Sequence, residues 1–218
     1  LLDINKKTED IASQNGMRGY VCNLLDLNET TMQLNSILKE YGTVSTLVLN
    51  SGSAKEGLIF EIDKQDISEG FENNFWAHQN ICQEVFKLMK FQETGGSIVF
   101  NITKQVLNQG KGFGAYGISK SAMLSLMRQY SIEGGPYGIR SNGVNPDKIQ
   151  SNLLNNELIL KRSKSRALSK EDYLKGNLLN REVLPENVAE AIYFLSEAES
   201  TTGALLGVDG GNASAFVR

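Results

Sequence analysis

The chain has 218 residues, of which 40% are hydrophobic and 22% are charged, so it can bury a sizeable core and is neither disordered nor collagen-like. A net charge of -3 gives no overall basic field that would attract nucleic acid. The apolar runs are far shorter than the roughly 18 to 20 residues that cross a bilayer, so no membrane span is predicted. Cys22, Cys82 and the single His78 lack metal-ligand spacing, which predicts no metal site and fits a reducing, cytoplasmic location.

The chain opens with an apolar stretch, Leu1-Leu2-Asp3, that is typical of the end of a strand, and a helix-like segment follows. Short β-rich runs then alternate with longer helical patterns, which predicts βαβ units and a mostly parallel sheet in one domain over residues 1–218. The predicted strands lie near residues 19–22, 44–49, 97–101, 139–144 and 204–208, and the predicted helices cover residues 29–41, 67–92, 115–134 and 185–198.

Two features of the second half stand out. Pro185 lies at the predicted first position of a helix, where proline is favoured. The polar, basic segment 152–175 has two interpretations: a solvated surface linker, or a substrate lid between a strand and a helix.

Tyr116 and Lys120 are the most informative pair, because a spacing of four places a phenol and an ammonium on one face of a helix. A nearby ammonium stabilises phenolate, so the tyrosine could exchange a proton with an alcohol or carbonyl oxygen. The alternative is an ordinary surface helix. We expect the ammonium of Lys120 to lower the pKa of Tyr116.

Three further polar positions could belong to the same site. Thr103 follows a predicted strand, at the edge where open α/β sheets bind ligands, although it could simply bond to nearby backbone. Asn74 lies within an amphipathic helix, where it could hold a water or be merely exposed. Asn50-Ser51-Gly52 ends a strand with a glycine that permits close approach of a ligand, or forms an ordinary turn.

Together these residues resemble the short-chain dehydrogenase/reductase family. Asn74, Thr103, Tyr116 and Lys120 match its Asn-Ser-Tyr-Lys tetrad. The resemblance implies a Rossmann-like doubly wound sheet and hydride transfer between a nicotinamide cofactor and an alcohol, aldehyde or ketone. Tyr116 would be the general acid/base, Lys120 would bind the nicotinamide ribose, Thr103 would polarise the substrate oxygen, and Asn74 would support a relay water.

The resemblance also implies a set of cofactor contacts. Asp3 would bind the adenosine ribose and favour NAD over NADP, unless it is a solvent-facing turn residue. The remaining implied cofactor contacts, besides Tyr116 and Lys120, are Asn23, Leu24, Asn50, Ser51, Gly52, Pro146, Ile149 and Ser151. The family's usual pairing of the helices that carry Asn74 and Tyr116 implies a homodimer or homotetramer.

A narrower likeness lies in Gly96-Ser-Ile-Val-Phe, Lys104, Glu133-Gly-Gly-Pro-Tyr-Gly-Ile-Arg140, Asn145-Pro-Asp147 and Gly210-Gly-Asn-Ala-Ser-Ala-Phe-Val-Arg218. These segments resemble the dehydrogenase part of fused rhamnulose-1-phosphate aldolase/alcohol dehydrogenases. That resemblance implies a lactaldehyde-like substrate and an aldolase domain fused or upstream.

One family feature is absent from the sequence: no glycine-rich phosphate loop directly follows a predicted strand and opens a helix. In the family, that first strand lies between the strands that end here at Asp3 and Leu49. We expect the domain to be incomplete at its N-terminal βα unit, as a fragment with little activity alone; the alternative is that the remaining strands pair across the gap.

Two other functions remain open. The chain could be a non-catalytic oligomerisation or interaction module on a dehydrogenase scaffold. It could also use the Tyr and Lys pair for epimerisation or dehydration.

Overall fold

The computed structural model describes residues 1–151 and 153–215. Asn152, the first residue of the segment interpreted as a linker or lid, and residues 216–218 of the narrower likeness lie outside the described residues. The strands are β1 (Leu2–Asp3), β2 (Tyr20–Val21), β3 (Thr46–Leu49), β4 (Gly96–Asn101), β5 (Ile139–Pro146) and β6 (Leu205–Val208). The α-helices are α1 (Thr8–Gln14), α2 (Leu27–Tyr41), α3 (Lys64–Phe71), α4 (Ala77–Gln92), α5 (Gly114–Gly134), α6 (Asn156–Lys164), α7 (Lys170–Lys175), α8 (Pro185–Glu197) and α9 (Asn212–Ala215).

All paired strands run parallel, which confirms the predicted α/β, Rossmann-like class. β3, β4, β5 and β6 form one sheet in that order, and β1 pairs with β2 in a separate two-stranded sheet. Within the described residues β1 and β3 do not pair with each other, so the alternative in which the strands close the gap is wrong. A strand upstream of Leu1 stays a prediction.

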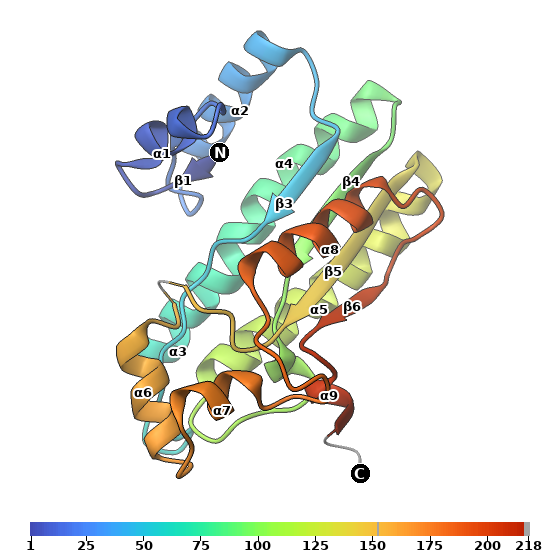
Figure 1. Cartoon of the computed structure of the whole chain (residues 1–218). Coiled ribbons are helices and arrows are strands. Elements are labelled where there is room, and N and C mark those ends of the chain that lie inside the picture. The colour runs from blue at the N-terminus through green and yellow to red at the C-terminus, as the bar shows by residue number, and fades with distance from the viewer. Residues whose placement is uncertain (152, 216–218) are drawn as a thin grey trace.

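Two apolar layers cover the four-stranded sheet. On one face, Ile98, Phe100 and Ile139 pack with Met123 and Met127 of α5 and with side chains of α4. On the other face, Val99 and Val144 pack with residues of α8. Figure 1 shows this arrangement, with α8 on one side of the sheet, α4 and α5 on the other, and α1, β1 and α2 grouped beside the β3 edge. Successive side chains of β4 and β5 point to opposite faces of the sheet and are nearly all buried, which produces these two layers.

The helix predicted over residues 67–92 is interrupted. A π-helical turn, η1 (Glu72–Trp76), separates α3 from α4. This turn was not predicted from the sequence, because π-helical turns are rare and a continuous helix is the ordinary interpretation of such a segment. The turn contains Asn74, which is completely buried, so the alternative interpretation of an exposed side chain there is wrong.

The basic segment from residue 153 to 175 folds into α6 and α7 rather than forming an extended linker. Side chains of Asn155 and Ser169 cap the two helices by accepting hydrogen bonds from backbone amides. Ile159, Tyr173 and Leu174 form a separate small core with Leu154. Figure 1 places both helices beyond the end of the sheet to which the strand arrows point. Among the described helices, none is long and apolar enough to cross a membrane.

Candidate active site

The carboxyl ends of β3 and β4 bring two asparagines together. The register pairs Leu49 with Phe100, so the next residues, Asn50 and Asn101, are neighbours at the sheet edge. The Asn101 amide Nδ2 donates to Asn50 Oδ1 at 2.7 Å. Thr103 lies two residues further along and is buried. The edge where ligands bind in open parallel sheets therefore carries polar side chains from two neighbouring strands.

Lys120 reaches this edge from α5. Its ammonium Nζ donates to the backbone oxygen of Asn101 at 2.8 Å, and its side chain is buried. A Cβ atom added to Gly52 would lie 2.7 Å from Asn74 Oδ1 and 3.6 Å from Lys120 Nζ. The structure thus brings together Gly52, Asn74 and Lys120, three residues that the sequence predicted for one site.

Asn74 is fully used in holding the loop after β3. Its Oδ1 accepts from the Ser53 backbone N–H at 3.0 Å, and its Nδ2 donates to the Ser53 carbonyl at 2.9 Å. The same Nδ2 also donates to Ser119 Oγ at 3.1 Å, and Ser119 Oγ donates to the Tyr116 carbonyl at 3.0 Å. The asparagine side chain therefore connects the loop that carries Gly52 to the helix that carries Tyr116.

Tyr116 lies in the first turn of α5, next to Thr103. Burial is the largest influence on the Tyr116 phenol and raises its pKa above the ordinary value, while hydrogen bonding with Thr103 and the charge of Arg162 oppose that increase. The expectation that Lys120 makes Tyr116 acidic is therefore wrong for this arrangement, because the ammonium is directed to the Asn101 carbonyl.

Lys120 is itself perturbed. Burial lowers its pKa to about 7, since a desolvated ammonium is unfavourable. Thr103 also has a local role, because its Oγ accepts from the Gln105 backbone N–H at 3.4 Å and caps the 3₁₀ turn Lys104–Val106. Thr103 therefore makes the backbone contact of its alternative interpretation, and its role toward a substrate oxygen stays a prediction.

The residues predicted to contact the adenosine part lie at the ends of β1 and β2. Asp3 Oδ1 accepts from the Asn5 backbone N–H at 2.9 Å, and Asn23 Oδ1 accepts from the Leu25 backbone N–H at 3.1 Å. The Leu24 carbonyl accepts from Asn80 Nδ2 of α4 at 2.9 Å. Asp3 therefore makes a turn contact, as expected for the alternative interpretation of a turn residue. Its second carboxylate oxygen, Oδ2, makes no hydrogen bond within the described residues.

The remaining predicted contacts follow β5. Pro146 ends that strand, and Ile149 packs against the core that Val99 and Val144 form. Ser151 Oγ accepts from the backbone amides of Leu153 and Leu154 at 3.2 and 3.4 Å, so its hydroxyl stabilises the entry to α6. The structure does not bring Ser151 to the cluster around Lys120.

The site has features that suit a nicotinamide dinucleotide. Gly52 leaves backbone accessible beside Asn74 and Lys120, in a place that a Cβ atom would fill. Asn145 Oδ1, at the end of β5, is buried without a hydrogen-bond partner among the described residues, as is Asn101 Oδ1. Unpartnered buried acceptors at a sheet edge fit a ligand with N–H or O–H donors, such as the carboxamide and ribose of that cofactor.

Three residues that complete the cluster were not predicted for it from the sequence: Asn101, Ser119 and His78. His78 Nε2 lies 3.0 Å from Ser51 Oγ, and its Nδ1 lies 3.0 Å from the Asn74 carbonyl oxygen. Burial and then the charge of Lys120 lower the pKa of His78 to about 4, so the imidazole is neutral. Its spacing of four from Asn74 was the available signal.

The fold and these side chains define a Rossmann-like oxidoreductase. A family model described as "Enoyl-(Acyl carrier protein) reductase" matches residues 1–213. The chain therefore belongs to the short-chain dehydrogenase/reductase family, whose members use nicotinamide cofactors.

Individual proteins agree with this family. The chain is similar to the uncharacterized oxidoreductase YuxG of Bacillus subtilis, with 33% identity over 186 residues that cover 82% of this chain and 27% of that protein. It is 29% identical to the 3-oxoacyl-(acyl-carrier-protein) reductase FabG of Chlamydia muridarum over 94% of this chain and 81% of that protein. A solved short chain dehydrogenase family protein from Francisella tularensis superposes with a TM-score of 0.81 and 26% identity, over 98% of this chain and 86% of that one.

Proposed function

We propose that the chain carries the catalytic part of an NAD(H)-dependent alcohol dehydrogenase or carbonyl reductase that acts on a small substrate. The observation that supports this proposal most is the convergence of Gly52, Asn74 and Lys120 at the sheet edge, next to Thr103 and Tyr116. A protein with only an interaction role would not need a buried lysine at this sheet edge, so the alternative of a non-catalytic interaction module is less well supported.

In this proposal the side chains divide the work. Tyr116 exchanges a proton with the substrate oxygen as general acid/base, and Thr103 orients that oxygen. Lys120 and the turn Asn50-Ser51-Gly52 hold the nicotinamide ribose, while Pro146 at the end of β5, with Ile149 and Ser151 after it, contacts the nicotinamide side of the cofactor. When bound, the cofactor supplies the hydride chemistry. Asn74 keeps the loop and the catalytic helix in register.

The preference for NAD rests on Asp3. A carboxylate at the end of this strand accepts hydrogen bonds from a ribose and repels a 2′-phosphate. Asn23 and Leu24 would line the adenine side. Comparing the affinities for NADH and NADPH tests this assignment, and Asp3→Ser should narrow the difference between them. Equal affinities in the unaltered chain would contradict an NAD preference.

The decisive experiment replaces the phenol. In the whole dehydrogenase of which this chain is the catalytic part, Tyr116→Phe should lower the rate of alcohol-dependent NAD reduction by about 10² to 10⁴, the usual contribution of general acid/base catalysis, and weaken cofactor binding much less. Tyr41→Phe, at an exposed tyrosine, is the control and should keep full activity. Fluorescence of bound NADH reports binding separately from turnover. If Tyr116→Phe retains full turnover, the proposal is wrong.

The narrower substrate assignment is a lactaldehyde-like aldehyde or its alcohol, within a longer polypeptide that also holds an aldolase domain. The match to 27% of YuxG supports a domain of this kind within a longer chain. A substrate panel of lactaldehyde, propane-1,2-diol and a 3-oxoacyl thioester tests the choice. If the protein binds cofactor and oxidises or reduces none of these compounds, but forms an epimerised or dehydrated product, the epimerase or dehydratase alternative is favoured.

We also propose a homodimer or homotetramer. Trp76 and Ile118, on the helical segments that carry Asn74 and Tyr116, are 52% and 42% exposed. Exposed apolar side chains on neighbouring helices favour association. Sedimentation velocity measures the mass in solution, and a monomer across the accessible concentration range would contradict this proposal.

A further inference from the structure

Three chain segments meet beside the first turn of α5. The loop after β3 contributes Glu56 and Gly57, and the Gly57 backbone N–H donates to the Gly112 carbonyl at 2.9 Å. Phe113 follows as the N-cap residue of α5, three positions before Tyr116. The third segment is α6, which contributes Arg162. The residues just before the turn that carries the phenol are therefore contacted by the loop after β3 and by α6.

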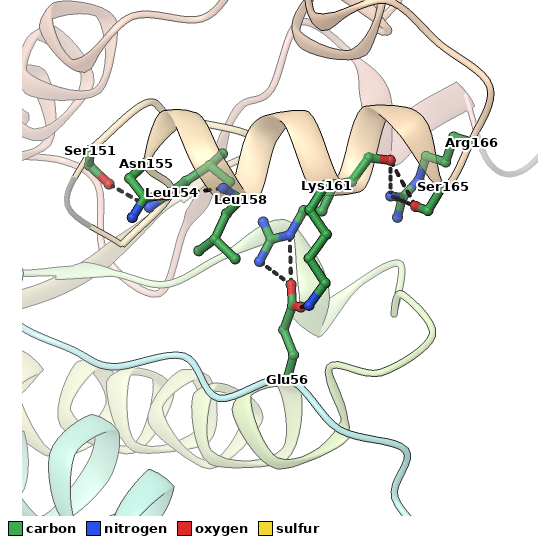
Figure 2. Close-up of polar contacts among 9 residues, drawn as sticks. Glu56, Ser151, Leu154, Asn155, Leu158, Lys161, Ser165 and Arg166 are labelled. Atoms are coloured by element: carbon green, nitrogen blue, oxygen red, sulfur yellow. Dashed lines mark hydrogen bonds and ion pairs between the residues drawn. The ribbon is translucent and has the colours of Figure 1, made fainter.

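Arg162 joins these segments through specific contacts. Its Nε donates to Glu56 Oε1 at 2.7 Å, and a terminal guanidinium nitrogen lies 2.6 Å from the same oxygen. Its Cζ lies 4.7 Å from the centre of the Phe113 ring. Only 13% of the Arg162 side chain is exposed. Figure 2 shows Glu56 projecting from its loop toward α6, where Lys161 also reaches it.

This pairing changes the pKa of the Glu56 carboxyl group. Burial alone would raise the pKa of Glu56, but Arg162 and Lys161 outweigh burial and hold it below its ordinary value. Glu56 therefore stays ionised and anchors the guanidinium. A planar guanidinium can pair with a carboxylate and stack on a ring at the same time, which an ammonium does less well.

Arg162 stacks on Phe113, three residues before Tyr116 at the start of α5, and its charge favours a lower pKa for the phenol, while Lys120 is directed to the Asn101 carbonyl. We propose that Arg162 is a positioning residue for Tyr116: fixed by Glu56 and Phe113, it holds α6 against the start of α5 and keeps a cation beside the phenol. This inference deepens the proposed function, because it assigns to α6 a part in setting the catalytic acid/base.

Other charges near this junction must be kept constant in a test. Lys161 contacts Glu56 Oε2 at 3.4 Å, and Arg166 donates to the Arg162 carbonyl at 2.9 Å. Lys120 lies one turn along α5, and Lys104 and Lys111 flank Thr103 and Gly112 in sequence. The substitutions below leave Lys104, Lys111, Lys120 and Arg166 unchanged.

The test follows the ionisation of Tyr116 directly. The full chain is labelled with carbon-13 at the tyrosine ring carbon that bears oxygen, and its NMR shifts are recorded against pH. Tyr116→Phe assigns the Tyr116 signal among the seven tyrosines of the chain. This readout needs neither substrate nor cofactor, so it is independent of turnover.

Arg162→Met should raise the titration midpoint of Tyr116 by roughly 0.5 to 1 pH unit, the order expected when one partly buried charge is removed. Arg162→Lys keeps the charge and should leave the midpoint within about a third of that shift. Lys161→Met removes the charge of a neighbouring side chain that is 71% exposed, and should have little effect on the Tyr116 midpoint.

An unchanged midpoint in Arg162→Met, or an equal shift in Lys161→Met or Arg162→Lys, would overturn the inference. If Arg162→Met does not fold, Arg162→Gln takes its place as the charge-removing variant, and an unchanged midpoint there would overturn the inference as well. In turnover assays the alkaline shift of the pH profile should follow the NMR midpoint. A failure of the proposed function would be distinguishable from a failure of this inference. In that case Tyr116→Phe would keep full turnover, while the NMR midpoints of the Arg162 and Lys161 variants would stay as expected.

Discussion

Asn74 is the residue whose hydrogen bonds connect the most distant parts of the site. Asn74→Ala would leave the Ser53 backbone N–H and carbonyl without their partner, and each unsatisfied buried group costs about 1 to 3 kcal/mol. We expect a loss of at least about 2 kcal/mol in the free energy of unfolding, measured by urea denaturation. Asn73→Ala is the matched control, because Asn73 is exposed and makes one contact, to Ser53 Oγ at 3.2 Å. Equal losses in both variants would contradict this account.

Lys120 should make stability depend on pH. Its pKa is lowered from 10.5 to about 7 by burial, so between these values the unfolded chain holds a proton that the folded chain has released. Stability therefore rises with pH across this window, as the charge that is unfavourable in the folded state is lost. Lys120→Met should remove that rise, measured as the difference in unfolding free energy between variant and parent from pH 7 to 10. Lys111→Met, at an exposed lysine, should keep the parent's slope.

The same residues show what spacing can and cannot predict. The four-residue separation correctly placed Tyr116 and Lys120 on one helix beside Thr103. It could not predict which way the Lys120 ammonium turns, because its acceptor is the backbone carbonyl of Asn101, a group that every residue possesses. Arg162 was equally hidden, since it came from a basic run that resembles solvated surface.

At the level of elements, helix ends were predictable where a side chain has a specific local role. Pro185 begins α8 as predicted, with the Leu184 backbone N–H donating to Asn187 Oδ1 at 3.1 Å. The π-helical turn at Asn74 was not predicted, and its Asn74 side chain bonds to the backbone of Ser53, which is distant in sequence. Local chemistry determines helix ends, whereas interruptions inside helices depend on tertiary contacts.

Helix caps offer a matched pair for a stability test. Asp26 Oδ1 accepts from the backbone amides of Asn28 and Glu29 at 2.9 and 3.1 Å at the start of α2. Asp63 occupies the same position before α3, but its side chain makes no such bond. Asp26→Ala should lower the free energy of unfolding by about 0.5 to 2 kcal/mol, measured by thermal and urea denaturation. Asp63→Ala should have a clearly smaller effect; a reversed order would contradict the role given to the cap.

For the whole molecule, the alternation of strand and helix patterns was sufficient to predict the parallel sheet and its strand positions to within a few residues. The fold class follows from it because each strand and crossover must bury one apolar face. The convergence of Gly52, Asn74 and Lys120 needed the family resemblance as well, since these residues come from three separate segments.

The divided sheet leads to a prediction about hydrogen exchange. Within the described residues β3 pairs only with β4, whereas β4 pairs on both sides with β3 and β5. In a parallel ladder alternate amides point to opposite neighbours, so about half of the β3 amides face the unpaired edge. Val48 of β3 is 43% exposed, while Val99, opposite it on β4, is fully buried.

We therefore expect the amides of Thr46–Leu49 to exchange markedly faster than those of Gly96–Asn101, because open backbone groups at an edge are accessible to water. Hydrogen exchange followed by NMR resolves individual amides, and alternate positions of β3 should differ from one another. The amides of β5, which is paired on both edges, provide the slow reference. Uniform protection of β3 at the level of β4 would mean that this edge is covered in solution. Repeating the measurement at lower protein concentration would then show whether a second copy covers it, since protection by association weakens on dilution.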